Sequence, residues 1–134
     1  MAKALKDFVT EARSRVTEVD PDTAEEMREE RDDLLILDVR EPDEYAAGHI
    51  PGAVNVPRGT LESAADPDYK HPHPELCRAR ERPILLYCKS GGRSAMATAT
   101  LADMGFREVY NIAGGAAVWI GDDCEWEGEL KEDV

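Results

Sequence analysis

The sequence predicts an α/β fold built on a mostly parallel β-sheet. Two short segments, LLIL at 34–37 and PILLY at 83–87, are continuously apolar. A strand with one face in water alternates apolar and polar residues, so continuous apolar runs indicate strands that are covered on both faces, as in parallel sheets. Helical patterns separate the predicted strands, and the connections are short. This alternation favours parallel strands joined by helices that pack on the sheet.

The first predicted elements follow from apolar spacing and from helix start signals. Residues 3–13 repeat apolar side chains at helical spacing, and 16–19 is a candidate strand. Asp20 followed by Pro21 places an N-cap before a proline at the first helical position, which predicts a helix to about residue 31. The strand at 34–37 comes next.

Beyond that strand we expect a short helix at 42–47, closed by Gly48, and a short strand at 53–56. Residues 64–74 hold three prolines and two histidines and predict a surface loop, with a helical turn at 75–80.

The last third of the chain begins with the strand at 83–87. An alanine-rich helix should follow from residue 93 to residue 104, with Gly105 as its C-terminal cap. Residues 108–112 predict another strand, and the glycine pair 114–115 precedes a short helix.

Length and composition predict a single domain. The chain has 134 residues, 42% of them hydrophobic and 34% charged, which suits one globular core. We expect that core at 16–121, after the helix at 3–13 and before a loosely held acidic tail at 122–134. No apolar run approaches a membrane span, and the early charges do not suit a signal peptide, so we expect a cytoplasmic protein.

Acidic residues outnumber basic ones by 29 to 16, which gives a net charge of −13 at pH 7. Such a surface repels nucleic acid and anionic lipid, so we expect neither as a partner. It also repels small anions. A site for an anionic substrate must therefore create its own local positive field.

The chain has three cysteines, and their odd number and spacing argue against a disulfide framework or a thiolate zinc site. Cys124 stands among acidic residues that would raise a thiol pKa, and Cys77 has no activating neighbours in sequence, so neither is expected to react. His71 and His73 lie near Cys77, but their spacing is not that of a known zinc site, and we expect no metal.

Cys88 has a different setting, because it begins the segment Cys-Lys-Ser-Gly-Gly-Arg-Ser between a predicted strand and a predicted helix. Adjacent glycines allow a tight turn that directs backbone N–H groups inward, and the helix start adds a positive dipole end. Lys89 and Arg93 can add full charges. In such surroundings a cysteine pKa falls from about 8.5 to roughly 3.5–7.5, so we expect a reactive thiolate beside an anion cradle. Asp38, at the end of the other buried strand, should lie at the same edge of the sheet.

The chain resembles the rhodanese family in motifs that occur in family order over most of residues 16–121. The matching segments are 35–41 with 44–45, 48–53 with Asn55, 86–94, 104–106, and Asn111 with 114–115 and Trp119. The resemblance implies a five-stranded, mostly parallel sheet flanked by helices on both faces.

The same resemblance implies residue roles. Cys88 would be the sulfur acceptor, within an active-site loop that binds substrate and consists of Lys89, Ser90, Gly91, Gly92 and Arg93. Asp38 and Arg40 would be structural supports near that loop, and Arg58 would lie near the pocket mouth.

The implied activity is that of a thiosulfate sulfurtransferase. The Cys88 thiolate would attack the outer sulfur of a small anionic donor, thiosulfate or a persulfide, and the bound sulfur would then pass to cyanide or to a thiol, which can belong to a protein. No metal or organic cofactor and no dedicated general base are implied. His49 is either a base or a residue that orders a turn.

Several alternatives remain open. A persulfide relay that serves a partner enzyme would use the same chemistry on Cys88. A cysteine phosphatase or arsenate reductase typically has a loop one residue longer, whereas four residues separate Cys88 from Arg93 here. A non-catalytic module would commonly lack the cysteine. A thiol redox protein would need Cys77 or Cys124 to approach Cys88 in space.

Overall fold

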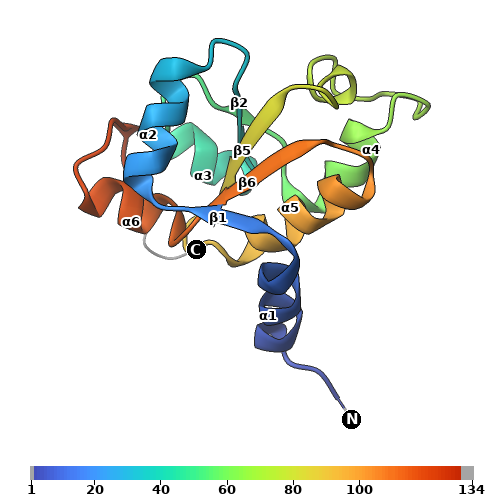
Figure 1. The fold of residues 1–134 in the computed structure, drawn as a ribbon, viewed down its shortest axis with the longest axis horizontal. Helices are drawn as coiled ribbons and strands as arrows, with labels where there is room; N and C mark the ends of the chain where they lie inside the picture. The colour runs from blue at the N-terminus through green and yellow to red at the C-terminus, as the bar shows by residue number, and fades with distance from the viewer. Residues whose placement is uncertain (1, 131–134) are drawn as a thin grey trace.

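One parallel sheet organises the computed structural model, which describes residues 2–130 (Figure 1). Its strands lie in the order β1-β6-β5-β2-β4 and have the bounds β1 Thr17–Val19, β6 Glu108–Ile112, β5 Pro83–Tyr87, β2 Leu35–Asp38 and β4 Val54–Asn55. The helices are α1 Leu5–Arg15, α2 Pro21–Glu30, α3 Pro42–Ala47, α4 Leu61–Ala65, α5 Gly92–Asp103 and α6 Gly115–Gly121. Turns of 3-10 helix occupy Arg58–Thr60 and Leu76–Arg78. The predicted five-stranded α/β architecture is confirmed.

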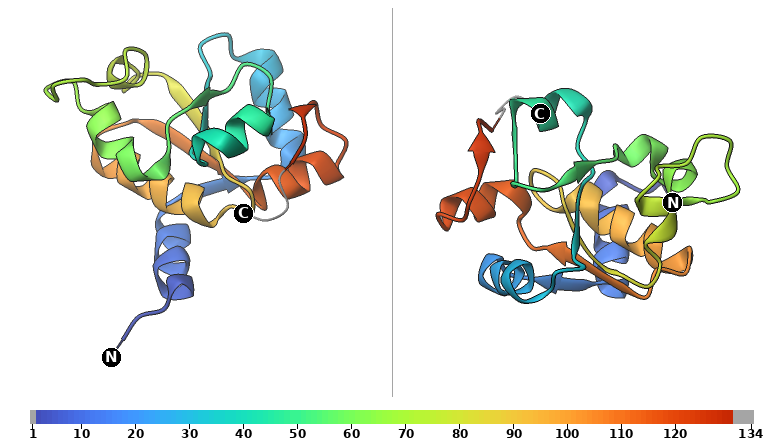
Figure 2. Two further views of the ribbon diagram at one scale, coloured as in Figure 1. Left: turned by 180° about the vertical axis from the view of Figure 1, so that it is seen from behind. Right: turned by 90° about the horizontal axis from the view of Figure 1, so that it is seen from above.

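The two central strands are buried on both faces, as their continuous apolar sequences predict. In β5, Ile84 and Leu86 pack in the same apolar cluster as Leu101 of α5. Leu85 belongs to the opposite cluster, which includes Trp119 of α6. Helices therefore cover both faces of the sheet, as the two views of Figure 2 show. No helix within residues 2–130 is both long and apolar enough to cross a membrane.

The pairing of β2 with β5 decides where the functional residues lie. The two strands are parallel, and Asp38 is in register with Tyr87. Asp38 and Cys88 therefore meet at the same edge of the sheet, which confirms the placement expected from the sequence.

Local start and stop signals are also confirmed. The Thr23 backbone N–H donates to Asp20 Oδ1 at 2.8 Å, so Asp20 caps α2. Gly105 follows α5 with a φ of +90°, the left-handed conformation that suits a C-terminal cap. The helical turn expected at 75–80 is shorter, because only Leu76–Arg78 forms a 3-10 turn.

Helix α1 lies outside the two main layers and projects from one edge of the body (Figure 1). It packs on α5, where Ala12 lies in a cluster with Ala95 and Ala99. Leu5 and Phe8, which lie on the predicted apolar face, are 70% and 51% exposed. This helix is thus attached to the start of α5 while much of its apolar surface remains uncovered.

Residues 122–130, the described part of the expected acidic tail, contact the body of the domain. Strand β7, Glu127–Gly128, pairs antiparallel with β3, Gly48–His49. The Trp126 ring packs edge-on against Tyr87 with 6.2 Å between ring centroids. The aromatic ring of Trp126 buries apolar surface against the domain, and this burial favours the packed position of the segment in spite of its acidic residues. Residues 131–134 of the expected tail lie outside the described part of the chain.

We expect Gly48→Ala to destabilise the protein by about 1–3 kcal/mol, the usual cost of overpacking. A β-carbon at this position would collide with the backbone carbonyl oxygen and amide nitrogen of Glu129. Urea unfolding checks this, with Gly59→Ala as the control, because a β-carbon there meets no atom within 4 Å. Equal unfolding free energies for the two variants would contradict the role given to the tail.

Candidate active site

Cys88 follows β5 directly and is 1% exposed. The carbonyl oxygens of Cys88 and Lys89 accept hydrogen bonds from the backbone N–H groups of Ala116 at 2.8 Å and Ala117 at 3.0 Å. Both donors lie in the first turn of α6, where helix N–H groups have no partner inside the helix. The first part of the turn at 88–94 is therefore fixed by the backbone of α6.

This attachment requires glycine at position 115. Gly115 has a φ of +62°, and a β-carbon there would lie 2.5 Å from the Cys88 carbonyl oxygen. Any side chain would push α6 away from the turn. The glycine pair 114–115 noted in the sequence thus permits a close backbone approach to Cys88.

Two donors converge on the sulfur of Cys88. The Gly91 backbone N–H lies 3.1 Å from Sγ, and the Ser94 hydroxyl lies 3.4 Å from it. Gly91 has a φ of +98° and is the N-cap of α5, so the sulfur also lies near the positive end of that helix. An anionic sulfur at this position gains two hydrogen bonds and a favourable dipole.

A series of three polar side chains connects the turn to the N-terminal helix. The Asn111 side-chain N–H donates to the Gly91 carbonyl oxygen at 3.2 Å and to Glu18 at 2.9 Å. Glu18 in turn forms an ion pair with Arg13 of α1, with 3.3 Å between the two atoms. The chain Arg13–Glu18–Asn111 thus links the N-terminal helix to the residue whose N–H contacts Cys88.

The guanidinium of Arg93 forms an ion pair with Glu44. Its two terminal nitrogens donate to the two carboxylate oxygens of Glu44 in α3 at 2.8 and 3.1 Å. Burial of Glu44 acts to raise its pKa, but the hydrogen bonds from Arg93 and from the Glu41 backbone N–H outweigh burial and lower that pKa. The positive charge expected from Arg93 is therefore shared with a buried carboxylate.

The remaining residues of the predicted loop are Lys89, Ser90 and Gly92. Ser90 is exposed and Lys89 is half-buried. Gly92 begins α5 and faces α1, since a β-carbon built there would lie 3.4 Å from a methyl group of Val9. The turn is thus in contact with the N-terminal helix.

Asp38 and Arg40 form a fully buried ion pair beneath this edge of the sheet. An Arg40 terminal nitrogen lies 2.7 Å from the Asp38 carboxylate and 2.7 Å from the Gly48 carbonyl oxygen. Its guanidinium also lies over the rings of Tyr87 and Trp126, 5.5 and 5.2 Å from their centroids. The pair thus connects the end of β2 with Gly48 and with two aromatic rings, and its role as a support for the Cys88 loop stays a prediction.

The Arg58 side chain contacts α4 and α5. Its guanidinium donates to Glu62 at 3.1 Å and to the Thr100 hydroxyl at 3.2 Å. These contacts place its charge beside α4 and the later part of α5. The expected place of Arg58 near the pocket mouth stays a prediction.

The histidines order turns. His49 Nδ1 lies 2.9 Å from the Tyr45 carbonyl oxygen, and its ring stacks on the Tyr45 ring. His73 Nδ1 accepts backbone N–H groups of Glu75 at 3.2 Å and Leu76 at 3.1 Å. Of the two roles left open for His49, the geometry favours the ordering of a turn.

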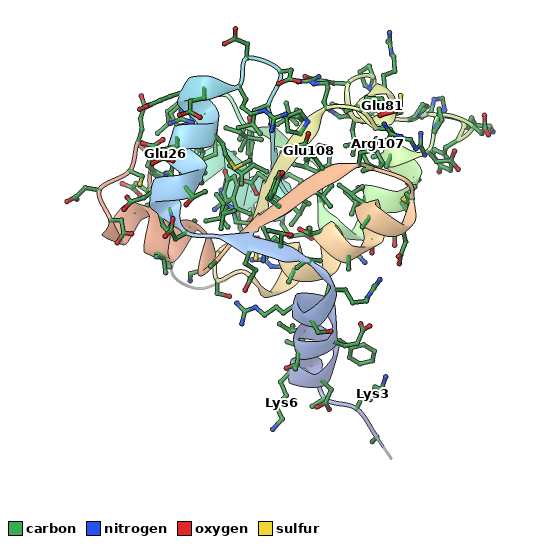
Figure 3. The ribbon with its side chains drawn as sticks, in the orientation of Figure 1. Lys3, Lys6, Glu26, Glu81, Arg107 and Glu108 are labelled. Carbon is green, nitrogen blue, oxygen red and sulfur yellow. The ribbon has the colours of Figure 1, made fainter. Side chains whose placement is uncertain are left out.

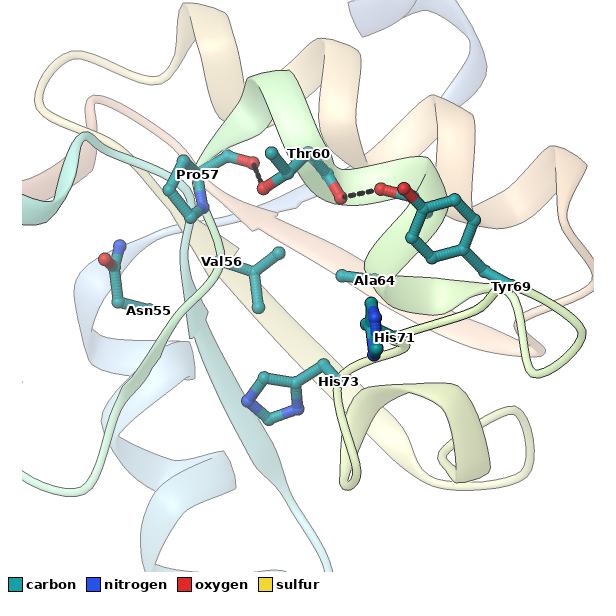
Figure 4. A pocket seen from close by; sticks show the side chains of 9 residues that line it. Asn55, Val56, Pro57, Thr60, Ala64, Tyr69, His71 and His73 are labelled. Atoms are coloured by element: carbon teal, nitrogen blue, oxygen red, sulfur yellow. Dashed lines mark hydrogen bonds between the residues drawn. The ribbon is translucent and has the colours of Figure 1, made fainter.

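A cavity of about 350 Å³ lies beside the proline-rich loop. Figure 4 shows the rings of His71, His73 and Tyr69 around it. Within residues 2–130, no group of three or more His, Cys, Asp or Glu side chains is arranged to hold a metal ion.

Cys77 and Cys124 differ from Cys88 in their surroundings. Both are free thiols and partly exposed. Burial raises the pKa of Cys124, and the nearby carboxylates of Glu25, Asp122 and Asp22 raise it further. The direction expected from the sequence is confirmed, although burial is the larger cause.

Three contacts at the site were not assigned from the sequence. They come from Glu44, Ser94 and Asn111, which bind Arg93, Cys88 and Gly91 respectively. Ser94 and Asn111 carried a usable signal, because one lies in the first turn of the helix after Cys88 and the other at the end of the neighbouring strand.

We expect Glu44→Gln to lower the free energy of unfolding by about 1–3 kcal/mol near pH 7, because the variant breaks the buried pair with Arg93. The pKa of Glu44 is lowered in the folded protein, so its contribution is complete above the ordinary carboxyl pKa of about 4.3 and is lost as the pH falls through the folded value. The difference between wild type and variant should shrink on acidification.

Urea unfolding at several pH values between neutrality and strong acid measures this difference. Glu62→Gln is the matched control, because it removes an exposed pair with Arg58 and should change stability little at any pH. A Glu44→Gln effect that is independent of pH would show that the carboxylate charge is not what stabilises the site.

Known proteins resemble this chain in sequence and in fold. A family model for the rhodanese-like domain matches residues 20–122. Thiosulfate sulfurtransferase 16 of Arabidopsis thaliana is 40% identical over 95 residues, which are 65% of this chain and 78% of that protein. Bacillus subtilis YrkF, provisionally named a sulfur carrier protein, is 36% identical over 112 residues, which are 84% of this chain and 55% of YrkF. This chain therefore spans about half the length of YrkF.

A solved structure from Rhodopseudomonas palustris, of a protein of unknown function called a possible tyrosine phosphatase, superposes with a TM-score of 0.83. It is 29% identical, and the match covers 98% of this chain and 96% of that one. The relatives named for sulfur transfer and the family model agree with the motifs in the sequence. This chain belongs to the rhodanese-like domain family.

Proposed function

We propose that this protein is a sulfurtransferase that carries sulfur as a persulfide on Cys88. The observation that carries the proposal is the convergence of the Gly91 N–H and the Ser94 hydroxyl on the Cys88 sulfur at the start of α5. Donors of this kind stabilise an anionic sulfur, which is the nucleophile in the first step and the product of the second.

The first step forms one sulfur–sulfur bond and breaks another. The Cys88 thiolate attacks the outer sulfur of thiosulfate, the bond within thiosulfate breaks, and sulfite leaves with the electron pair. The new outer sulfur carries the negative charge of the persulfide. The turn at 88–93 and the N-terminus of α5 stabilise this charge with backbone dipoles.

In the second step a thiolate or cyanide removes the outer sulfur and regenerates the Cys88 thiolate. Both steps use only sulfur or carbon nucleophiles, so neither metal nor organic cofactor takes part. The name of the Arabidopsis relative supports thiosulfate as a donor, and the name of YrkF supports a role as a carrier of sulfur. The same Cys88 chemistry serves a free enzyme or a relay.

After treatment with thiosulfate, the Cys88 peptide should gain the mass of one sulfur atom, about 32 Da. Mass spectrometry of the intact chain and of its peptides measures this gain. Cys88→Ser should abolish it, whereas Cys77→Ser and Cys124→Ser should retain it, because those thiols lack the donors that surround Cys88. Sulfur found on Cys77 or Cys124 in place of Cys88 would overturn the proposal.

A phosphatase activity is the main rival, since the Rhodopseudomonas palustris structure is called a possible tyrosine phosphatase. Two features argue against it. Only four residues separate Cys88 from Arg93, which leaves less room for a tetrahedral phosphate. Both terminal nitrogens of Arg93 also donate to Glu44, so its guanidinium is already paired with a carboxylate.

We therefore expect no appreciable hydrolysis of p-nitrophenyl phosphate by the wild-type protein. Release of nitrophenolate is followed by absorbance, with Cys88→Ser as the blank. Rapid hydrolysis by the wild type that is lost in Cys88→Ser would establish phosphatase chemistry at this site.

A further inference from the structure

Glu18, the middle residue of β1, is connected to the Cys88 sulfur by a continuous series of hydrogen bonds. It is in register with Asn111 on β6, and its Oε2 accepts a hydrogen bond from the Asn111 side-chain nitrogen at 2.9 Å. The same nitrogen donates to the Gly91 carbonyl oxygen at 3.2 Å. The Gly91 backbone N–H lies 3.1 Å from Cys88 Sγ. One side chain and one glycine therefore lie between Glu18 and the reactive sulfur.

The Asn111 amide is held in its orientation by two acceptors. Asn111 is 0% exposed, and its Oδ1 has no hydrogen-bond partner within residues 2–130. If the amide flipped, Oδ1 would face the Glu18 carboxylate and the Gly91 carbonyl oxygen, and three acceptors would meet without a hydrogen. Hydrogen bonds to a charged acceptor are the stronger kind, so Glu18 is the stronger of the two partners. Glu18 therefore fixes the direction in which Asn111 donates.

Gly91 depends on such a partner because it has no side chain that could set its conformation. Its φ is +98°, and glycine reaches many other backbone conformations at little cost. The Gly91 carbonyl oxygen also accepts the backbone N–H of Ala95 at 3.0 Å, in the first turn of α5. Together with the bond from Asn111, this contact fixes the carbonyl group and thus the position from which the Gly91 N–H reaches Sγ.

The charge of Glu18 has a second effect, which is opposite in sign. A carboxylate near the Cys88 turn repels an anionic sulfur. Arg13 reduces this repulsion, because its Nε lies 3.3 Å from Glu18 Oε2 and its Nη2 lies 3.3 Å from a β-carbon built on Gly91. The hydrogen bond and the charge of Glu18 therefore act on the sulfur in opposite directions, so a suitable pair of variants can separate them.

We propose that Glu18 is a positioning residue for the reaction of Cys88, and that it acts through Asn111 by holding the Gly91 N–H against the sulfur. The inference rests on the proposed function and adds a residue to it. Glu18 and Arg13 lie outside the segment 20–122 that the family model matches, so the match assigns them no role. The Gly91 N–H stabilises the Cys88 thiolate before it attacks the donor and again when the persulfide is discharged.

Two substitutions of Glu18 isolate the hydrogen bond. Glu18→Gln and Glu18→Ala remove the same charge, but only glutamine retains an oxygen that can accept from Asn111. The Glu18 side chain is 28% exposed, so neither variant leaves a cavity in the core. The other charged groups near the turn are the same in both variants, so their effects cancel in the comparison: Asp38, Arg40, Glu44, Lys89 and Arg93.

The first experiment follows the thiol without sulfur transfer. The NMR shift of the Cys88 β-carbon against pH gives the midpoint of its ionisation, and amide spectra show that the variants are folded. The midpoint should lie about 0.3–1 pH unit higher in Glu18→Ala than in Glu18→Gln, the effect of one weakened hydrogen bond. The Gly91 amide proton should shift in Glu18→Ala and stay close to its wild-type position in Glu18→Gln.

Salt and a distant ion pair provide the controls. Added salt should leave the difference between the two variants in place, because salt screens charges and not a hydrogen bond. Glu81 pairs with Arg107 with the same Nε–Oε2 distance of 3.3 Å, before β5 and β6 begin and far from α1 (Figure 3). Glu81→Gln and Glu81→Ala should have equal midpoints. Equal midpoints for the two Glu18 variants, or a difference that salt removes, would overturn the inference.

The second experiment measures the rate at which thiosulfate loads Cys88 with sulfur at a series of pH values, by mass spectrometry. The profile of Glu18→Ala should be displaced toward alkaline pH relative to that of Glu18→Gln, by the same amount as the NMR midpoint. A residue with only a structural role would lower the rate equally at every pH. That outcome would also overturn the role proposed for Glu18.

The two experiments separate the two proposals. If Cys88 takes up no sulfur, the proposed function fails, while the NMR titration still decides whether Glu18 positions Gly91. If Cys88 loads with sulfur and the two Glu18 variants behave alike, sulfur transfer stands and the role of Glu18 is overturned.

Discussion

The buried pair of Asp38 and Arg40 is the interaction on which the architecture of the site depends. Both side chains are 0% exposed, so each charge has lost its water and must be compensated inside the protein. Removing one partner of such a pair typically costs about 3–5 kcal/mol. Arg40 also binds the Gly48 carbonyl oxygen and lies over the rings of Tyr87 and Trp126, so one guanidinium connects β2, the end of α3, β5 and the C-terminal segment. Burial, with the nearby Asp38 carboxylate, raises the pKa of Tyr87 above its usual range and keeps this layer neutral apart from the pair.

The sequence indicated the parts of the structure that depend on local patterns. Continuous apolar runs predicted β2 and β5, and the Asp20–Pro21 pair predicted the start of α2. The position of Cys88 between a buried strand and a helix followed from the same patterns. Contacts between distant segments could not be read in this way. Arg93 and Glu44 are 49 residues apart in the sequence. The sequence therefore indicated the positive charge of Arg93 near the Cys88 turn but not the carboxylate that pairs with it. The contacts of the C-terminal segment could not be predicted either, because the residues that pack around Trp126 lie far away in sequence.

The electrostatics of the site are local. The protein is strongly acidic, yet the Cys88 sulfur is surrounded by an N–H group, a hydroxyl and a helix N-terminus, none of which carries a full charge. The nearby full charge of Arg93 is balanced by Glu44. Fixed dipoles therefore stabilise the sulfur.

The attachment of the turn to α6 has an evolutionary consequence. The carbonyl oxygens of Cys88 and Lys89 are held by backbone N–H groups of Ala116 and Ala117, so the bonds do not depend on which side chains occupy those positions. Gly115 is constrained by its close approach to Cys88, and Ala116 and Trp119 are constrained by full burial. The surface of α6 is therefore free to diverge while the shape of the turn is inherited unchanged. A scaffold of this kind can acquire new partners on its surface without altering the chemistry that it presents to them.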